Sequence, residues 1–190
     1  MRLSTLLFAA LLTFVGAVPA SAQFCPPGSF GPSGQAPCTP CSAGFFNPVV
    51  GQTFCSACPG GTFSLTGSAS CTTCPAGTYS LPGSASCTPC PGGFFSPSPG
   101  SGSCSPCPAG SFSSPGSSIC SLCPAGSYSP SPGSGACLPC PAGSISSTNG
   151  SSQCTPCPPG MVPNASRTQC VEAPVPSDSP SWGRIKTIYR

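Results

Sequence analysis

The sequence predicts a small disulfide-rich repeat protein, an elongated array of nine short hairpin-like units with little regular secondary structure and a minor β content. Eighteen cysteines recur along the chain, with gaps of two residues alternating with gaps of twelve or thirteen. The 24 glycines and 29 prolines break any helical periodicity. A unit this short cannot bury a hydrophobic core of its own, so a covalent closure has to hold it together.

Residues 1–22 have the three parts of a secretory signal peptide. Arg2 makes the start positive, Leu6 to Val15 is an apolar run, and Ala20-Ser21-Ala22 is a small-x-small cleavage site. We therefore expect cleavage after Ala22 and a mature chain that starts at Gln23. The apolar run is shorter than the roughly 20 residues that span a bilayer, and no later stretch is more apolar. The expected mature chain has no transmembrane segment.

The opening half of each unit in the array, residues 23–170, follows one pattern. A cysteine, usually Cys-Pro, precedes a glycine by three positions and an aromatic or aliphatic residue by five. Glycine supplies the positive φ that other residues resist, which indicates a turn after the opening cysteine. The glycines are Gly28, Gly44, Gly61, Gly77, Gly93, Gly110, Gly126, Gly143 and Gly160, and the apolar residues are Phe30, Phe46, Phe63, Tyr79, Phe95, Phe112, Tyr128, Ile145 and Val162.

The closing half of each unit predicts a second turn. In the first eight units a glycine lies four residues before the closing cysteine, and the ninth unit lacks it. The difference in unit length falls between the apolar residue and this glycine, as in Leu81-Pro82 or Pro97-Ser98-Pro99, where a turn tolerates it. Each unit is thus expected to be a hairpin of two very short extended pieces.

The repeat suggests one disulfide pairing among the many that eighteen cysteines allow. The array begins on an opening cysteine and ends on a closing one, so closing each unit on itself uses every thiol. Such a loop contributes ~3 kcal/mol in the chain-entropy model. The expected pairs are Cys25–Cys38, Cys41–Cys55, Cys58–Cys71, Cys74–Cys87, Cys90–Cys104, Cys107–Cys120, Cys123–Cys137, Cys140–Cys154 and Cys157–Cys170.

Three other roles for the cysteines fit the sequence less well than one disulfide in each unit. Interlocked six-cysteine modules would divide eighteen evenly, but the repeat shows no higher period of three. The spacing also suits zinc ribbons. Sites of four thiolates would leave two of the eighteen cysteines without a metal ion, however, and no Lys or Arg lies nearby to balance the negative charge of such a site. A thioredoxin-like redox centre needs a βαβ context that is absent.

The charge distribution excludes several function classes. Between Gln23 and Ser166 there is no Asp, Glu, Lys, Arg or His. General acid–base catalysis and activated nucleophiles need such groups, so we expect no enzyme and no cofactor. Calcium cages need carboxylates, and nucleic-acid binding needs a basic stripe along the chain. Neither is available in the array.

The segment that begins at Cys74 resembles the ephrin-receptor-like cysteine-rich repeat; it reads Cys-Pro-Ala-Gly-Thr-Tyr-Ser…Gly-Ser-Ala-Ser-Cys-Thr-Pro-Cys-Pro. That family lies within the broader set of growth-factor-receptor (EGF-like) and tumour-necrosis-factor-receptor modules. The resemblance covers residues 25–170 and is strongest from Cys58 to Cys157. Two positions differ from the usual pattern: Ser42 stands where proline is usual, and Val162 stands where an aromatic residue is usual. The resemblance implies an elongated, disulfide-laddered extracellular rod that serves as a receptor stalk, adhesive segment or matrix component, and it implies no kinase.

Two kinds of surface site stand out. The double aromatics Phe45-Phe46 and Phe94-Phe95 are candidate contacts for a partner, since exposed aromatics serve as interface anchors. The competing interpretation is that the repeating aromatic packs on its own disulfide and the next unit. Asn149 and Asn164 each begin an N-glycosylation tripeptide.

Residues 171–190 break the repeat and are expected to form a disordered Pro/Ser-rich tail that ends in basic residues. Together these features predict a secreted structural or adhesive scaffold in the matrix, wall or cell surface. Its partner would be an extracellular protein, a glycan or another copy of itself, since near-zero charge promotes association. The alternative function is a soluble receptor-like module that binds an extracellular protein or glycan.

Overall fold

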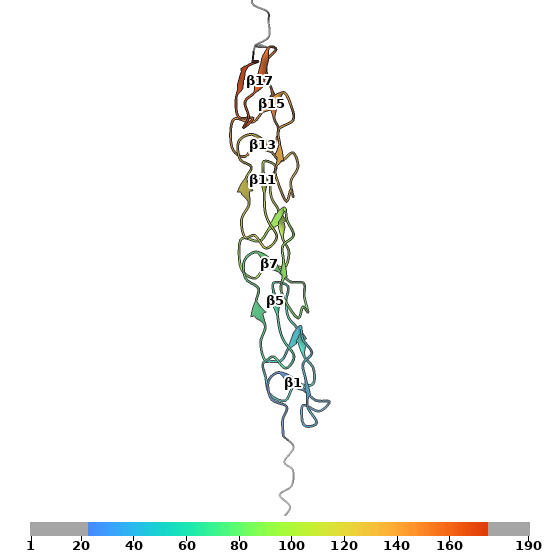
Figure 1. Cartoon of the computed structure of the whole chain (residues 1–190). Coiled ribbons are helices and arrows are strands. Elements are labelled where there is room, and N and C mark those ends of the chain that lie inside the picture. The colour runs from blue at the N-terminus through green and yellow to red at the C-terminus, as the bar shows by residue number, and fades with distance from the viewer. Residues whose placement is uncertain (1–22, 175–190) are drawn as a thin grey trace, which may run out of the picture.

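The array forms one slender rod in the computed structural model, which describes residues 23–174 (Figure 1). The expected signal peptide, with its cleavage point after Ala22, and most of the expected tail lie outside the described residues. Within the described range no helix has the length and apolar character of a membrane span.

Nine antiparallel two-stranded hairpins follow one another along the rod, and they confirm the predicted fold class. Their first strands are β1 (Ser29–Phe30), β3 (Phe45–Phe46), β5 (Thr62–Phe63), β7 (Thr78–Tyr79), β9 (Phe94–Phe95), β11 (Ser111–Phe112), β13 (Ser127–Tyr128), β15 (Ser144–Ile145) and β17 (Met161–Pro163). Their second strands are β2 (Thr39–Pro40), β4 (Ser56–Ala57), β6 (Thr72–Thr73), β8 (Thr88–Pro89), β10 (Ser105–Pro106), β12 (Ser121–Leu122), β14 (Leu138–Pro139), β16 (Thr155–Pro156) and β18 (Cys170–Glu172).

The second strand of most hairpins is the dipeptide between a closing cysteine and the next opening cysteine. In the third unit, for example, Thr62 and Phe63 pair with Thr73 and Thr72. The two-residue gap between cysteines is therefore a strand that links consecutive units. The last hairpin is longer, and β18 continues through Glu172, two residues past the closing cysteine.

A type II turn opens every unit. In the third unit the Thr62 N–H donates to the Pro59 carbonyl at 3.1 Å, and Gly61 between them has φ +84°. A positive φ at the third turn position is the mark of a type II turn, and it is the conformation that glycine adopts without strain. The same bond recurs in all nine units.

The structure joins the two cysteines of each unit, with Cα–Cα distances such as 5.5 Å for Cys25–Cys38 and 5.8 Å for Cys58–Cys71. All eighteen cysteines are bridged. The opening cysteines of the first eight units are fully buried and form the apolar core of the rod. The repeating aromatics are only half-buried, so sulfur rather than aromatic carbon fills the axis of the rod.

Backbone hydrogen bonds tie each unit to the next. The Gly61 N–H of the third unit donates to the Ser80 carbonyl of the fourth at 2.9 Å. In return the Gly83 N–H of the fourth unit donates to the Cys58 carbonyl of the third at 2.8 Å. This reciprocal pair recurs from unit to unit, so the connection between units is satisfied by main-chain groups at fixed positions.

Each unit also meets the next unit but one. A Cβ added at Gly61 would collide with the carbonyl oxygen of Gly100, which lies two units further along. The same contact recurs in units one to six, where the glycine of the opening turn lies against the second glycine of the unit two further along. In unit seven, Gly126 lies against Ser166 of the ninth unit instead. Repeat arrays commonly contact only their immediate neighbours, so this rod is more tightly interlocked than its sequence period indicates.

Candidate interaction surface

A column of small polar side chains lies inside the rod, beside the cysteines, and the sequence reasoning missed it. The residue six positions after the opening cysteine is almost fully buried in units two to eight. The Ser64 hydroxyl donates to the Phe45 carbonyl of the preceding unit at 2.9 Å, and Ser113 does the same to Phe94 at 3.0 Å. The set is Asn47, Ser64, Ser80, Ser96, Ser113, Ser129 and Ser146. The sequence feature that could have indicated this column is the serine that regularly follows the repeating aromatic residue.

The length of a unit decides where this side chain bonds. In three longer units the serine hydroxyl donates to a carbonyl in the loop of its own unit, as the Ser96 hydroxyl does to the Ser98 carbonyl at 3.3 Å. Asn47 stands in another longer unit and makes both kinds of bond. Its Nδ2 donates to the Ser29 carbonyl of the first unit, and its Oδ1 accepts from the Val49 N–H. The extra turn residue is thus accommodated without an unpaired buried polar atom among the described side chains.

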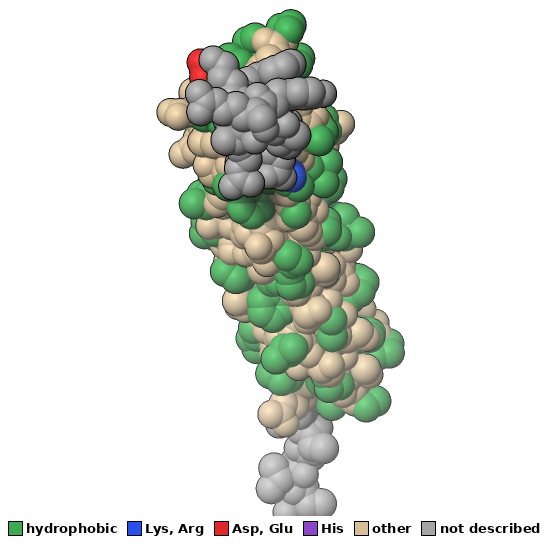
Figure 2. Space-filling view, turned by 45° about the horizontal axis from the view of Figure 1, so that its top comes forward, with side chains coloured by type: hydrophobic (Ala, Val, Ile, Leu, Met, Phe, Trp, Pro, Cys, Tyr) green, Lys and Arg blue, Asp and Glu red, His purple; other side chains and the backbone are tan. Residues whose placement is uncertain are grey.

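The outer surface of the array carries no charge from residue 23 to residue 166. Figure 2 shows hydrophobic side chains scattered among other uncharged side chains and backbone, and the acidic and basic groups visible on this face lie near the C-terminal end of the described rod. Those groups are Arg167, which is half-buried, and Glu172, which is exposed. A surface of this kind offers partners shape, apolar contact and hydrogen bonds, but no ion pairs.

The two double aromatics are not equivalent in the structure. Phe46 and Phe95, at the repeating position, are half-buried. Phe94 is also half-buried, and its ring lies beside Gly133 of the seventh unit, where an added Cβ would be 3.5 Å from its Cζ. Phe45 is the exposed member. Of the predicted aromatic contacts, only Phe45 is open to a partner over a substantial part of its ring.

A shallow hollow of about 240 Å³ lies beside Phe45. Residues of the first two units line it: Phe30, Ser42, Phe45, Phe54 and Cys55. Phe54 was not singled out by the repeat pattern, because it occupies the variable position before a closing cysteine. The hollow is aromatic and uncharged, which suits an apolar group and no ionic ligand.

The two predicted glycosylation asparagines have different surroundings. Asn149 is exposed, and its Oδ1 accepts the Ala125 N–H at 2.9 Å while no bond from its Nδ2 is present within the described residues. Asn164 is half-buried. Its Nδ2 donates to Thr168 Oγ1 at 3.2 Å, and its Oδ1 accepts the Thr168 N–H at 2.9 Å. The side chain of Asn164 therefore braces the last hairpin turn, whereas Asn149 leaves its amide nitrogen open.

The ninth unit replaces the missing glycine by a side chain. In units two to eight the second glycine donates its N–H to the opening cysteine of the preceding unit. Ser166 stands at that position in the ninth unit, and the carbonyl of Cys140 instead accepts a hydrogen bond from Arg167 Nη1. Arg167 has φ +56°, so the left-handed conformation has moved one residue along the chain. The guanidinium thus closes the last contact between units.

Comparison with known proteins supports the same type of repeat. A family model described as tyrosine-protein kinase ephrin type A/B receptor-like matches residues 28–65, 77–118 and 110–153. The chain is also similar to the protein named "Sushi, von Willebrand factor type A, EGF and pentraxin domain-containing protein 1" from Rattus norvegicus and from Mus musculus. Each is 48% identical over 44 residues, which are 23% of this chain and 1% of that protein.

The family matches fall on successive units of the disulfide rod and together cover more than half of the chain. The short segment shared with the rat and mouse proteins extends over only a small part of their length, so it defines a kind of module and not a whole-protein activity. The bridged units have the cysteine-rich character of extracellular repeat modules. The chain belongs to the ephrin type A/B receptor-like family of cysteine-rich repeats.

Proposed function

We propose that this protein is a secreted extracellular scaffold that acts by its length and durability, without catalysis. The observation that carries the proposal is the interlocking of the units, in which each unit bonds to the next and also touches the next but one. Such continuity resists bending at any single junction, because several main-chain contacts must break together. A structural or adhesive role in a matrix, wall or cell-surface layer needs this property.

Composition supports the extracellular part of the proposal. Disulfides such as the nine bridges of this chain form and persist in oxidising compartments. Residues 1–22 have the features of a signal peptide that is removed after Ala22. In this scheme residues 23–170 are the cysteine-rich array, and residues 171–190, which begin with the end of β18, are a basic tail. The uncharged surface favours association with other uncharged surfaces.

The experiment is expression of the full chain, with its own leader, in a eukaryotic host. We expect the protein in the medium or in the detergent-insoluble layer around the cells, with intact mass rising by about 18 Da on reduction of nine bridges. Sedimentation velocity should give the high frictional ratio of a rod. Retention of a reduced chain inside the cell, or a compact sedimenting species, would contradict the proposal.

A second candidate function is a soluble receptor-like module for an extracellular protein or glycan. The aromatic hollow between Phe30, Phe45 and Phe54 favours it, because such a hollow is where an apolar anchor of a partner would bind. Capture of one specific ligand by a monomeric rod, lost when Phe45 is replaced by Ser, would support this function over the scaffold.

A further inference from the structure

Exposed apolar side chains are concentrated at the N-terminal end of the rod. The first two units expose five large ones, among them Phe24 at 59%, Phe45 at 38% and Phe54 at 62%, together with Val49 and Val50. From the third unit onward the exposed large apolar residues are spread thinly, as Leu65, Leu81, Ile119, Leu122, Leu138, Val162 and Val171. We call the set Phe24, Phe45, Val49, Val50 and Phe54 the aromatic end.

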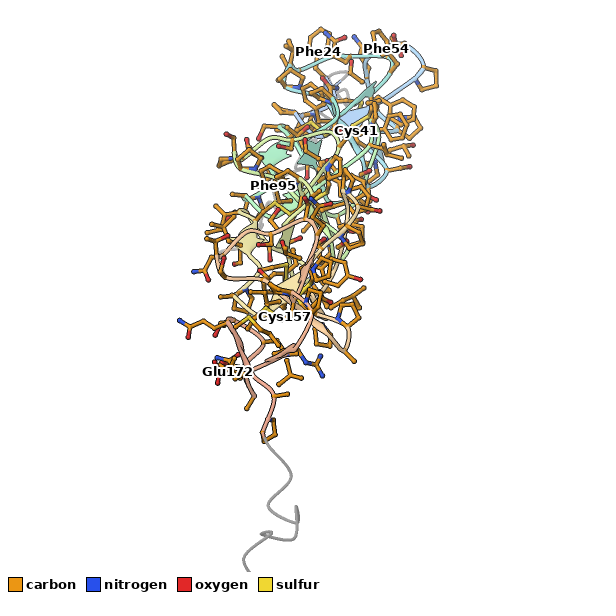
Figure 3. All side chains as sticks on the ribbon, turned by 90° about the horizontal axis from the view of Figure 1, so that it is seen from above. Phe24, Cys41, Phe54, Phe95, Cys157 and Glu172 are labelled. Atoms are coloured by element: carbon orange, nitrogen blue, oxygen red, sulfur yellow. A yellow bond between two sulfur atoms is a disulfide. The ribbon has the colours of Figure 1, made fainter. Side chains whose placement is uncertain are left out.

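The aromatic end combines projecting rings with a hollow. Phe24 lies against the second unit, where a Cβ added at Gly51 would be 3.0 Å from its Cδ1, and most of its ring remains exposed. Phe45 and Phe54 border the hollow of about 240 Å³. Figure 3 shows Phe24 and Phe54 at one end of the molecule and Glu172 at the other. A projection and a recess at one end of the molecule are the elements of a self-complementary contact.

Charge favours a second copy as the occupant. Two identical surfaces can meet about a two-fold axis only if no like charges are brought together, since such contacts cost several kcal/mol. The side chains of the aromatic end meet this condition, because no side chain from residue 23 to residue 166 is charged. The one charge that cleavage after Ala22 would add near it is the α-amino group of Gln23. Glu172 lies at the opposite end of the molecule (Figure 3), and Arg167 belongs to the ninth unit, where it bonds to Cys140 of the eighth.

We propose that the aromatic end pairs with the aromatic end of a second copy, so that exposed rings of each copy enter the hollow of the other. This inference rests on the proposed scaffold function and names the partner and the surface through which the scaffold grows. The product is a rod of twice the length.

The test compares two double variants of the secreted full chain by sedimentation equilibrium over a wide range of protein concentration. The first is Phe24→Ser with Phe54→Ser, which removes two rings of the aromatic end. The matched control is Leu65→Ser with Ile119→Ser, two side chains that are 65% and 69% exposed in the middle of the rod. All four side chains are exposed, so both variants should fold and keep nine bridges.

We expect the wild-type chain and the mid-rod control to give twice the monomer mass at high concentration, and the aromatic-end variant to remain monomeric. Electron microscopy of the wild type should then show rods of doubled length. A wild-type chain that stays monomeric throughout overturns the pairing, as does dimerisation that both variants lose or both retain. A secreted, monomeric, elongated rod would refute this inference and leave the scaffold proposal standing, whereas a compact or unsecreted chain would refute the scaffold proposal.

Discussion

Glycine at the opening turn of a unit serves two purposes that only the structure separates. Positive φ is a local requirement, since the type II turn demands it wherever the turn occurs. The second requirement is the space that the next unit but one needs. Gly110 faces the Gly150 carbonyl of the eighth unit, whereas Gly143, with nearly the same φ, has no described atom near its missing Cβ.

The chain offers a matched pair of substitutions that distinguishes these two requirements. Gly110 and Gly143 both stand in the sequence Cys-Pro-Ala-Gly-Ser, with φ of +81° and +79°. Replacement by Ala costs roughly 1–2 kcal/mol at either site through the backbone alone. Only Gly110→Ala adds a collision with the Gly150 carbonyl.

The measurement is amide hydrogen exchange at Gly150, whose N–H is bonded to the Cys123 carbonyl at 2.8 Å. We expect Gly110→Ala to speed exchange there by at least about tenfold, a loss of roughly 1.4 kcal/mol, and Gly143→Ala to leave it nearly unchanged. Equal effects of the two variants would show that contact between alternate units adds nothing to stability.

The two glycosylation tripeptides should behave differently in a host that recognises them. Asn149 lies on an exposed turn and its Nδ2 donates to no other described residue, while the Nδ2 of Asn164 is bonded to Thr168. We expect a glycan on Asn149 and little or none on Asn164. Intact mass of the secreted protein should drop by one glycan in Asn149→Gln and should be unchanged in Asn164→Gln; the reverse result would contradict the assignment.

Among the hairpins, the second turn of the shorter interior units differs from that of the last unit. In the third unit Gly67 has φ +76°, and the Ser68 N–H donates to the Leu65 carbonyl at 3.2 Å, which defines a type II turn. The ninth unit cannot form this turn at Ser166, which lacks a positive φ. Terminal repeats often depart from type, and here the departure brings Arg167 to the contact with the preceding unit.

Removal of the guanidinium should loosen the last hairpin. Arg167→Ala keeps the strained backbone and loses the bond to the Cys140 carbonyl, so we expect a loss of about 1 kcal/mol. Arg167→Gly loses the same bond but relieves the left-handed strain, so it should be less destabilising than the Ala variant. Hydrogen exchange of peptides from residues 157–172 measures both. Faster exchange in the Gly variant than in the Ala variant would refute this account.

At the scale of the whole rod, the absence of acidic and basic side chains between residues 23 and 166 has a thermodynamic consequence. Stability changes with pH only where the folded and unfolded chains bind different numbers of protons. Residues 23–166 contain no carboxylate, imidazole or amine side chain, so they bind the same number in both states at moderate pH. Residues 23–166 therefore contain no carboxylate whose protonation could destabilise the fold on acidification.

We therefore expect the urea midpoint of the bridged rod to stay nearly constant between about pH 4 and pH 8. Circular dichroism follows the transition, and added salt should leave the midpoint similarly unaffected by charge screening. A midpoint that falls steadily on acidification would contradict this account and would mean that groups outside residues 23–166 control stability.

The sequence by itself determined the hairpin, its bridge and its opening turn, because cysteine, glycine and proline act within one unit, through covalent closure and restricted φ. It also determined the uncharged surface. Only the tertiary structure decided that serines such as Ser113 are buried, that Gly110 meets Gly150, and that Phe24 and Phe54 share an exposed end. These features depend on how each unit is rotated against the next. That rotation is set by backbone hydrogen bonds between units, whose partners no local pattern specifies.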